Sequence, residues 1–395
     1  MKKIKVAILG AGNCAKSLVE GVQYYSEIKN TNGLMMQNIG GYFASDIEFV
    51  CAFDIDKRKV GKKLGKALKE KPNNAFNIVD EINSSAPVYL APVIDGYAMH
   101  LDNYPESDRF LVDKQHMEDT CIYINGWEDD EYIKRVKKSI IEKIRYHEVD
   151  VLINYLPVGS EKATYFWADI CLQTKINLVN CIPVFIASDE EWQNKFYDAE
   201  IAIIGDDMRS QFGASVLSQM LQELAFDRGH EVKCHIQRNV GGNTDFLNME
   251  DKSRLKSKKI SKENVIRSQN TIRGISQEGS FLHAGPSEYI QYYGDNKVAN
   301  FRLELKGFGG APVIFDAQLS VQDSPNSAGV VIDAIRYVKV AQEMGIYGAL
   351  YGPSAFTQKT PPMQMMFNEA LKECNDLANR NYTKITTNGN GNIRI

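Results

Sequence analysis

The stretch Lys3-Ile4-Lys5-Val6-Ala7-Ile8-Leu9-Gly10-Ala11-Gly12-Asn13-Cys14-Ala15 predicts the fold of the first part of the chain. Its apolar residues 4–9 are typical of a short buried strand, and the two glycines allow a sharp turn and a close approach of the backbone to a ligand. Ala15 lets the following helix pack tightly on the strand, which completes the pattern G-x-G-x-x-A. The N-terminal amides and dipole of that helix would face the pyrophosphate of a dinucleotide. The alternative is an ordinary strand-helix unit whose glycines serve only packing.

A second apolar stretch, residues 47–53, ends at two acidic residues, Asp54 and Asp56. A carboxylate at the end of the second strand binds the ribose hydroxyls of a dinucleotide, which favours NAD over NADP. We expect Asp54 to make this contact, with Asp56 as the second candidate. The basic residues 57–59 that follow weaken the preference for NAD. Because these acids lie further from the glycines than the usual ~20 residues, segment 24–45 is expected to be an insertion.

The composition excludes several classes of protein. The chain has 395 residues, enough for two domains, and a formal net charge of −4, which does not suggest general binding to nucleic acid or an anionic membrane. No apolar run approaches the roughly 18 residues of a membrane span, and the first strand starts too early for a signal peptide. Seven cysteines without a C-x-x-C pair predict reduced thiols in the cytoplasm and argue against a zinc site, and each of the six isolated histidines is expected to be a structural residue instead of a metal ligand.

Strand and helix signals alternate up to about residue 227, which predicts a parallel, doubly wound sheet. Strands are expected at residues 150–156, 176–180 and 201–205, and helices at 57–71, 128–147 and 216–226. Later strands lack long helices between them, which predicts an antiparallel or mixed sheet in a second domain. These strands are expected at residues 232–237, 289–293, 299–305 and 313–321, before a long helix at 326–344.

Residues 205–215 combine a buried strand, small polar residues and the start of a helix. Backbone amides at such a helix start, together with the Ser210 hydroxyl, can hold a phosphate. The alternative is that Ser210 or Ser215 simply caps the helix.

Four lysines lie in polar surroundings. Lys258 and Lys262 are four residues apart, so on a helix they share one face, and they follow the polar loop 241–248. Converging lysines suit an anionic sugar phosphate and a developing oxyanion. Lys297 and Lys359 lie in loops, and Asp323 begins a helix that it could merely cap. Taken one by one, solvated surface lysines are the alternative.

The whole set of motifs resembles the myo-inositol-1-phosphate synthases of the shorter bacterial and archaeal type. The resemblance spans nearly the whole chain and rests on the order of several motifs, at residues 10–15, 20–22, 154–160, 180–185, 205–207, 239–243, 257–262 and 323–329. It implies an α/β fold with a Rossmann NAD-binding domain (1–227), an inserted α+β catalytic and tetramerisation domain (228–322), and a C-terminal segment (323–395) that returns to the Rossmann domain.

The resemblance also implies the activity. NAD oxidises C5 of D-glucose 6-phosphate, C6 is deprotonated and attacks the C1 aldehyde, and NADH reduces the ketone, which yields 1L-myo-inositol 1-phosphate, equally named 1D-myo-inositol 3-phosphate. The implied catalytic residues are Lys258, Lys262, Lys297, Lys359, Asp207 and Asp245. The implied substrate-binding residues are Ser210, Gln211, Gly213, Ala214, Ser215 and Asn243. The implied cofactor-binding residues are Gly10, Gly12, Asn13, Cys14, Ala15, Asp54, Asp56, Tyr155, Pro157, Asp323 and Ser324.

Two other functions remain open at this point. An NAD-dependent sugar-phosphate dehydrogenase would release NADH at each turnover, and a dinucleotide-sensing protein would bind NAD without turning over glucose 6-phosphate. The resemblance further implies a homotetramer with a divalent or a monovalent cation as a possible cofactor, and no nucleic-acid or membrane partner.

Overall fold

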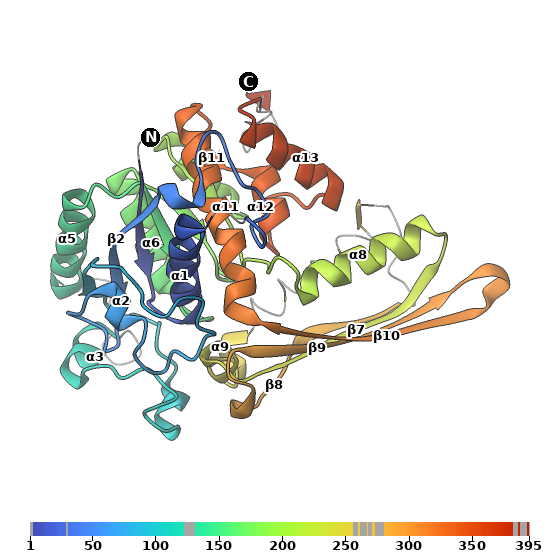
Figure 1. Ribbon diagram of the computed structural model, residues 1–395, viewed down its shortest axis with the longest axis horizontal. Helices are drawn as coiled ribbons and strands as arrows, with labels where there is room; N and C mark the ends of the chain where they lie inside the picture. Colours follow the sequence, from blue (N-terminus) through green and yellow to red (C-terminus); the bar gives the residue numbers. More distant parts are fainter. Residues whose placement is uncertain are drawn as a thin grey trace.

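The computed structural model describes residues 3–28, 31–121, 131–255 and 280–381, together with residues 260, 267, 271–272, 386–387 and 393–394. A seven-stranded sheet with helices on both faces forms one part of the molecule, and a long four-stranded sheet extends away from it (Figure 1). Within these ranges, no helix is both long and apolar enough to cross a membrane. All seven cysteines carry free thiols.

The seven-stranded sheet is parallel throughout, which confirms the doubly wound prediction. Its strand order is β11-β6-β5-β4-β1-β2-β3. Successive strands are therefore added on one side of β1 up to β3 and on its other side from β4 onward, which places a topological switch point between β1 and β4. Ligands bind at the carboxyl ends of the strands beside such a switch point. The strands are β1 (Ile4–Leu9), β2 (Ile47–Asp54), β3 (Val88–Leu90), β4 (Val151–Asn154), β5 (Asn177–Asn180), β6 (Ala202–Ile204) and β11 (Gly348–Ala349).

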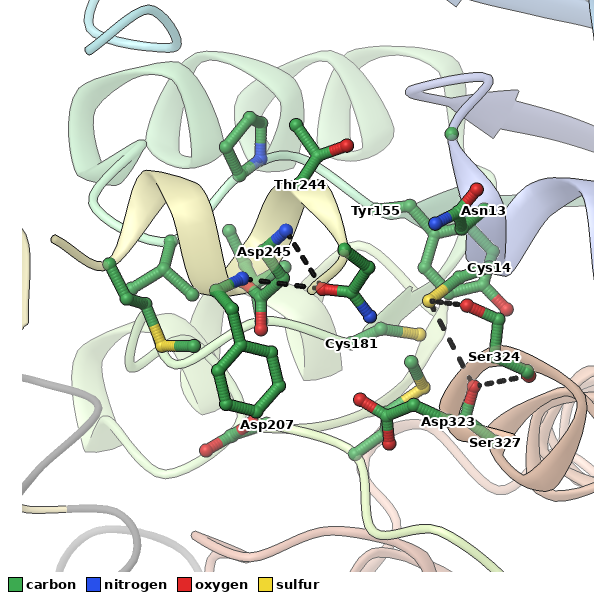
Figure 2. Close-up of a pocket in the computed structure, with 18 of the residues that line it drawn as sticks. Asn13, Cys14, Tyr155, Cys181, Asp207, Thr244, Asp245, Asp323, Ser324 and Ser327 are labelled. Atoms are coloured by element: carbon green, nitrogen blue, oxygen red, sulfur yellow. Dashed lines mark hydrogen bonds between the residues drawn. The ribbon is translucent and has the colours of Figure 1, made fainter. Parts of the chain in front are cut away.

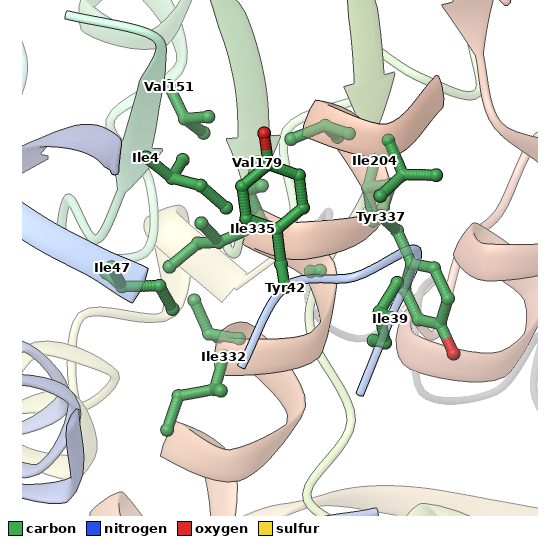
Figure 3. Close-up of a cluster of buried hydrophobic side chains, with 14 of the residues drawn as sticks. Ile4, Ile39, Tyr42, Ile47, Val151, Val179, Ile204, Ile332, Ile335 and Tyr337 are labelled. Carbon is green, nitrogen blue, oxygen red and sulfur yellow. The ribbon is translucent and has the colours of Figure 1, made fainter. Parts of the chain in front are cut away.

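Apolar cores lie on both faces of this sheet because successive strand residues point to opposite sides. One core joins Ile4 and Val6 to helices α1 (Asn13–Glu27) and α11 (Asp323–Glu343), and Figure 3 shows Ile332 and Ile335 of α11 packed among the strands. On the other face, Ala7 and Leu9 belong to a core with α5 (Glu131–Tyr146), α6 (Glu161–Thr174) and α7 (Glu190–Asp198). Shorter helices complete this part: α2 (Leu64–Ala67), α3 (Lys114–Thr120), α12 (Tyr351–Thr357) and α13 (Phe367–Ala378).

The four-stranded sheet is mixed, as predicted. Its strands are β7 (Glu231–Gly241), β8 (Phe281–Tyr289), β9 (Asn296–Lys306) and β10 (Pro312–Gln322), in the order β10-β9-β7-β8. β9 runs antiparallel to β7 and β10, whereas β8 is parallel to β7. Helix α8 (Ala214–Asp227) packs on this sheet through Leu217 and Leu221. The domain boundaries at residues 227 and 322 stay predictions.

The prediction of a helix at residues 57–71 is wrong, because α2, at residues 64–67, is the one helical part of this segment. Gly61 has a φ of +80°, which ends a helical path. Lys59 is fully buried and donates a hydrogen bond to the Ala11 carbonyl at 2.8 Å. This segment therefore packs against the glycine turn instead of forming a surface helix.

Two further expectations differ from the structure. Residues 289–293 are not a strand, because β8 ends at Tyr289 and a 3-10 turn follows, closed by a hydrogen bond from the Gly294 amide to the Gln291 carbonyl (3.0 Å). The long C-terminal helix begins at Asp323 instead of residue 326, with Gln322 as its N-cap. Pro325 fits within its first turn because the first amides of a helix need no helical partner.

Candidate active site

A cavity opens at the carboxyl ends of β1, β4, β5 and β6, where this sheet meets the short helix α9 (Thr244–Asn248) and the start of α11. It brings together most of the residues that the sequence singles out, namely Gly12, Asn13, Cys14, Tyr155, Pro157, Asp207, Ser210, Ala214, Ser215, Asn243, Asp245, Lys297, Asp323, Ser324 and Lys359. Gly10, Ala15, Asp54, Asp56, Gln211 and Gly213 lie outside its lining. Lys258 and Lys262 fall outside the described residues.

The glycine turn after β1 has the geometry that a pyrophosphate needs. Gly10 has a φ of +90°, and a Cβ atom there would lie 2.8 Å from the Tyr155 carbonyl oxygen, so only glycine fits. Helix α1 begins at Asn13, and its N-cap, Gly12, has no side chain that could cap the first amides. Those amides and the helix dipole can therefore hold an anion.

The two acids after β2 differ in their surroundings. One oxygen of Asp54 accepts a hydrogen bond from the Ala11 amide (2.7 Å), and the other accepts one from the Asp56 amide (2.8 Å). Asp54 thus fixes the glycine turn against β2. Asp56 is fully buried and forms an ion pair with Arg58, which leaves Asp54 as the better placed of the two for a ribose.

The start of α8 forms a second anion cradle. Gly213 is the N-cap of α8, so neither Ser210 nor Ser215 occupies the cap position. A Cβ atom at Gly213 would lie 2.7 Å from the Ser210 Cβ atom, so this turn requires glycine. The Gln211 side chain points away from the cavity and donates to the Gly33 carbonyl at 2.6 Å.

Of the four candidate lysines, Lys297 and Lys359 lie in the described part of the chain, and each is paired with a carboxylate. The Lys359 Nζ atom lies 2.7 Å from Asp207 and 2.7 Å from the Met208 carbonyl oxygen. Backbone hydrogen bonds from Lys359 to Asp207 (2.8 Å) and from Thr360 to Asp206 (3.0 Å) hold the two segments side by side. Lys297, near the start of β9, forms an ion pair with Asp323. Each lysine therefore has a carboxylate beside it within the cavity.

Helix α9 supplies a third acid. The Asn243 side chain caps this helix by accepting from the amides of Asp245 (3.1 Å) and Phe246 (3.3 Å). Figure 2 shows Asp245 of α9, Asp207 after β6 and Asp323 of α11 around one cavity, although they come from three distant parts of the sequence. Burial raises the pKa of the Cys14 thiol to about 12, so this cavity-lining sulfur stays protonated at neutral pH.

The sequence analysis missed several residues of this site. Gln237 and Asn239 line the cavity from β7, and Asn73, Cys181 and Ser327 also border it. The signal for the first two is the alternation His235-x-Gln237-x-Asn239, three polar residues on one face of a strand. All three are buried beneath α8.

The site combines a Rossmann sheet of this strand order, a glycine turn at the start of α1, and a cavity with two lysine-carboxylate pairs. Together these features define an NAD-dependent enzyme. Comparisons with known proteins specify the family. A family model described as myo-inositol-1-phosphate synthase matches residues 213–324. The inositol-3-phosphate synthase of Mycolicibacterium smegmatis is 41% identical over 377 residues, which cover 94% of this chain and 96% of that protein.

The inositol-3-phosphate synthase of Corynebacterium glutamicum is 40% identical over 367 residues, 92% of this chain and 94% of that protein. The crystal structure of a myo-inositol-1-phosphate synthase-related protein from Thermotoga maritima shares the fold, with a TM-score of 0.76 at 24% identity over 95% of this chain and 98% of that one. The chain belongs to the myo-inositol-1-phosphate synthase family, whose members are isomerases.

Proposed function

We propose that this chain converts D-glucose 6-phosphate to 1D-myo-inositol 3-phosphate, the first step of inositol biosynthesis, without net oxidation. The observation that carries this proposal is the shared cavity, which places the glycine turn, the start of α8 and two lysine-carboxylate pairs around one space. A redox cofactor, a phosphate and a sugar that develops negative charge each find suitable groups there.

The first amides of α1 would hold the pyrophosphate of NAD, with Gly10, Gly12 and Ala15 allowing its close approach. Asn13, Cys14, Tyr155, Pro157 and Ser324 would border the cofactor, Asp54 would accept hydrogen bonds from a ribose, and Asp56 would support that loop. NAD supplies a reversible acceptor for hydride when it is bound. The chain must keep it in place between oxidation and reduction of the same carbon, which a cavity lined from α1, α9 and α11 favours.

The first amides of α8, with the hydroxyls of Ser210 and Ser215, would bind the substrate phosphate. Gly213 and Ala214 would let it approach closely, while Gln211 fixes the loop through Gly33. Asn243 holds α9 so that Asp245 faces the sugar. Lys262 and Lys297 would add positive charge near the phosphate.

Lys359 and Lys258 would stabilise the oxygens of the sugar that become negative as C5 is oxidised and C6 is deprotonated. A protonated lysine stabilises an alkoxide or enolate more than the neutral ground state, which accelerates the reaction. Asp207 holds Lys359 in place, and Asp323 does the same for Lys297.

Phosphorus NMR of the product formed from glucose 6-phosphate and NAD tests the proposal. The synthase gives inositol phosphate while absorbance at 340 nm, which reports NADH, stays flat. Steady accumulation of NADH would instead identify a sugar-phosphate dehydrogenase, and NAD binding without any product would identify a sensor.

The role of Asp54 gives a separate prediction. Asp54→Ala removes a charged hydrogen-bond acceptor, whose loss amounts to about 1.5–3 kcal/mol, so NAD should bind at least roughly tenfold more weakly. Calorimetric titration measures this affinity, with the exposed Asp80→Ala as control. Unchanged affinity in Asp54→Ala rules out this role, and wild-type protein should prefer NAD to NADP.

Assembly, cation use and location complete the proposal. We infer a homotetramer, which the exposed apolar side chains of β10 support. We also infer a cytoplasmic location. A divalent or monovalent cation is a further possible cofactor, although no group of three or more His, Cys, Asp or Glu suited to a metal occurs in the described part of the chain. Activity after exhaustive chelation, in buffers that differ only in the monovalent ion, tests this point.

A further inference from the structure

A buried carboxylate that lies outside the cavity lining connects three segments of the site. Asp295 is 3% exposed and lies in the turn just before β9. Its backbone carbonyl accepts a hydrogen bond from the Asp323 amide at 2.9 Å, so it lies directly beneath the first residue of α11.

The Asp295 side chain accepts hydrogen bonds from all three segments. Its Oδ1 atom lies 2.8 Å from the Ser324 hydroxyl oxygen, 3.1 Å from the side-chain Nδ2 atom of Asn243 and 3.4 Å from the side-chain Nδ2 atom of Asn13. Its Oδ2 atom accepts from the Ser324 backbone amide at 3.0 Å. One carboxylate therefore joins the glycine turn, the cap of α9 and the start of α11.

The two asparagine partners cannot turn their oxygens toward Asp295. The Asn243 oxygen is engaged as the cap of α9, and the Asn13 oxygen accepts from the backbone amides of Asn74 (2.8 Å) and Ala75 (3.1 Å). Both side chains therefore present NH₂ groups to Asp295. Only a group that accepts hydrogen bonds at both of its atoms satisfies these donors and the Ser324 amide together.

Each partner of Asp295 lies within two residues of another group that lines the cavity. Cys14 follows Asn13, Asp245 lies two residues after Asn243, and Asp323 precedes Ser324, and all of them line the cavity. Figure 2 shows these neighbours converging from the glycine turn, α9 and α11. A shift of Asp295 would move the cofactor turn relative to the carboxylates that face the sugar.

We propose that Asp295 is a positioning residue for hydride transfer, which sets the distance between the cofactor turn and the sugar through Asn13, Asn243 and Ser324. This inference rests on the proposed function. Hydride must leave and return to the same carbon, so a misplacement of about 1 Å lowers the rate of both transfers, an effect on the order of 10²-fold. Among the described residues, the Asp295 side chain bonds to Asn13, Asn243 and Ser324 and not to α8, whose first amides would bind the substrate phosphate, so binding of that phosphate should change little.

The test compares Asp295→Asn with wild-type protein. The amide has nearly the same shape but presents an NH₂ group to existing donors whichever way it turns. We expect kcat to fall about 10–10²-fold with KM for glucose 6-phosphate within roughly threefold. Deuterium at C5 should slow the variant more than wild type, because hydride transfer then limits turnover. NAD should bind more weakly to the variant, and the melting temperature of the cofactor-free protein should fall by a few degrees.

The exposed Asp80→Asn provides the matched control and should behave as wild type. Wild-type kcat and isotope effect in Asp295→Asn would overturn the inference, as would a rise in KM alone. If wild-type protein itself does not turn over glucose 6-phosphate, the proposed function fails instead. Should Asp295→Asn not fold, Ser324→Ala removes one donor and keeps the carboxylate. A fall in its kcat together with a larger isotope effect of deuterium at C5 supports the inference, and unchanged kcat overturns it.

Discussion

Single lysines decide what the cavity can stabilise. The side chains of Lys359 and Lys297 are 12% and 16% exposed, and each forms an ion pair with a carboxylate. A lysine that is restrained in this way can meet a developing negative charge without first being ordered, which makes its interaction strongest in the transition state.

We therefore expect Lys359→Ala and Lys258→Ala to lower turnover by about 10² to 10³ while NAD affinity stays nearly unchanged. Lys297→Ala and Lys262→Ala should also raise KM, because phosphate is charged in the ground state as well. Steady-state kinetics on protein shown to be folded by circular dichroism measures both effects. Lys372→Ala on the exposed face of α13 is the control. Near-normal turnover in both Lys258→Ala and Lys359→Ala excludes the assignment.

His235 shows how hydrogen bonding fixes the charge of a buried residue. Ser218 donates its hydroxyl proton to Gln237 (2.8 Å), so the ring Nε2 atom of His235 must donate to Ser218 (3.1 Å). The Nδ1 atom then accepts from Gln222 (3.1 Å), which makes the ring neutral. Burial lowers its pKa to about 4.

A pH dependence of stability follows from this. The unfolded ring titrates near its ordinary pKa of about 6.5, so the unfolded state binds the proton first and the free energy of unfolding falls as pH drops from 6.5 to 4. The loss is on the order of 3 kcal/mol relative to His235→Gln, which does not titrate. Urea unfolding at pH 7, 5.5 and 4 measures it. A constant difference between the two proteins across this range contradicts the neutral, buried ring.

At the scale of elements, α11 holds the insertion that precedes β2. Arg336 is fully buried and donates to the carbonyls of Met36 (2.8 Å), Gln37 (3.0 Å) and Tyr42 (3.3 Å) while pairing with Asp333. Within the same insertion, the Gly33 carbonyl accepts a hydrogen bond from the Gln211 side chain. By holding the insertion, α11 therefore also supports the loop that precedes α8.

Arg336→Met should lower the free energy of unfolding by about 3–5 kcal/mol, because it leaves the Asp333 carboxylate buried without its partner. The double variant Arg336→Met with Asp333→Leu should lose less, since no unpaired charge remains. Denaturant unfolding of the two single variants and the double variant gives the coupling energy. Additive losses would contradict a buried pair that acts as a unit.

The elements also show how far the sequence alone leads. Local patterns predicted β1, its glycine turn and the parallel strands, because periodicity and turn chemistry act within short stretches. The candidate residues that line the cavity came mainly from the order of motifs shared with the family. The helix expected at residues 57–71 failed because Lys59 is drawn inward by Ala11, a contact between distant residues. Asp295, Gln237 and Asn239 were missed for the same reason: their partners Ser324, Ser218 and Gly285 lie far away in the sequence.

At the scale of the whole molecule, the four-stranded sheet extends away from the cavity and presents apolar side chains to solvent. Val313, Ile314 and Phe315 of β10 are 40%, 55% and 40% exposed. Such an edge strand is suited to association with another copy of the chain, since an exposed apolar edge otherwise promotes aggregation.

We expect a homotetramer by light scattering at micromolar concentration, and Ile314→Glu should shift it to smaller species because the new charge would be buried in the interface. Tyr146→Glu, on α5 and 81% exposed, is the control and should leave the assembly intact. A monomeric wild-type protein contradicts this expectation.

The return of α11 and β11 to the first sheet has a consequence for synthesis on the ribosome. β1 is translated before the second sheet, but the helix that covers one of its faces starts only at Asp323, and the strand that extends the sheet beyond β6 is residues 348–349. Until then the nascent chain exposes Ile4, Val6 and Val151, which later pack against that helix. This domain therefore cannot complete its core while the second sheet is being translated, and its folding has to wait until α11 and β11 have been synthesised.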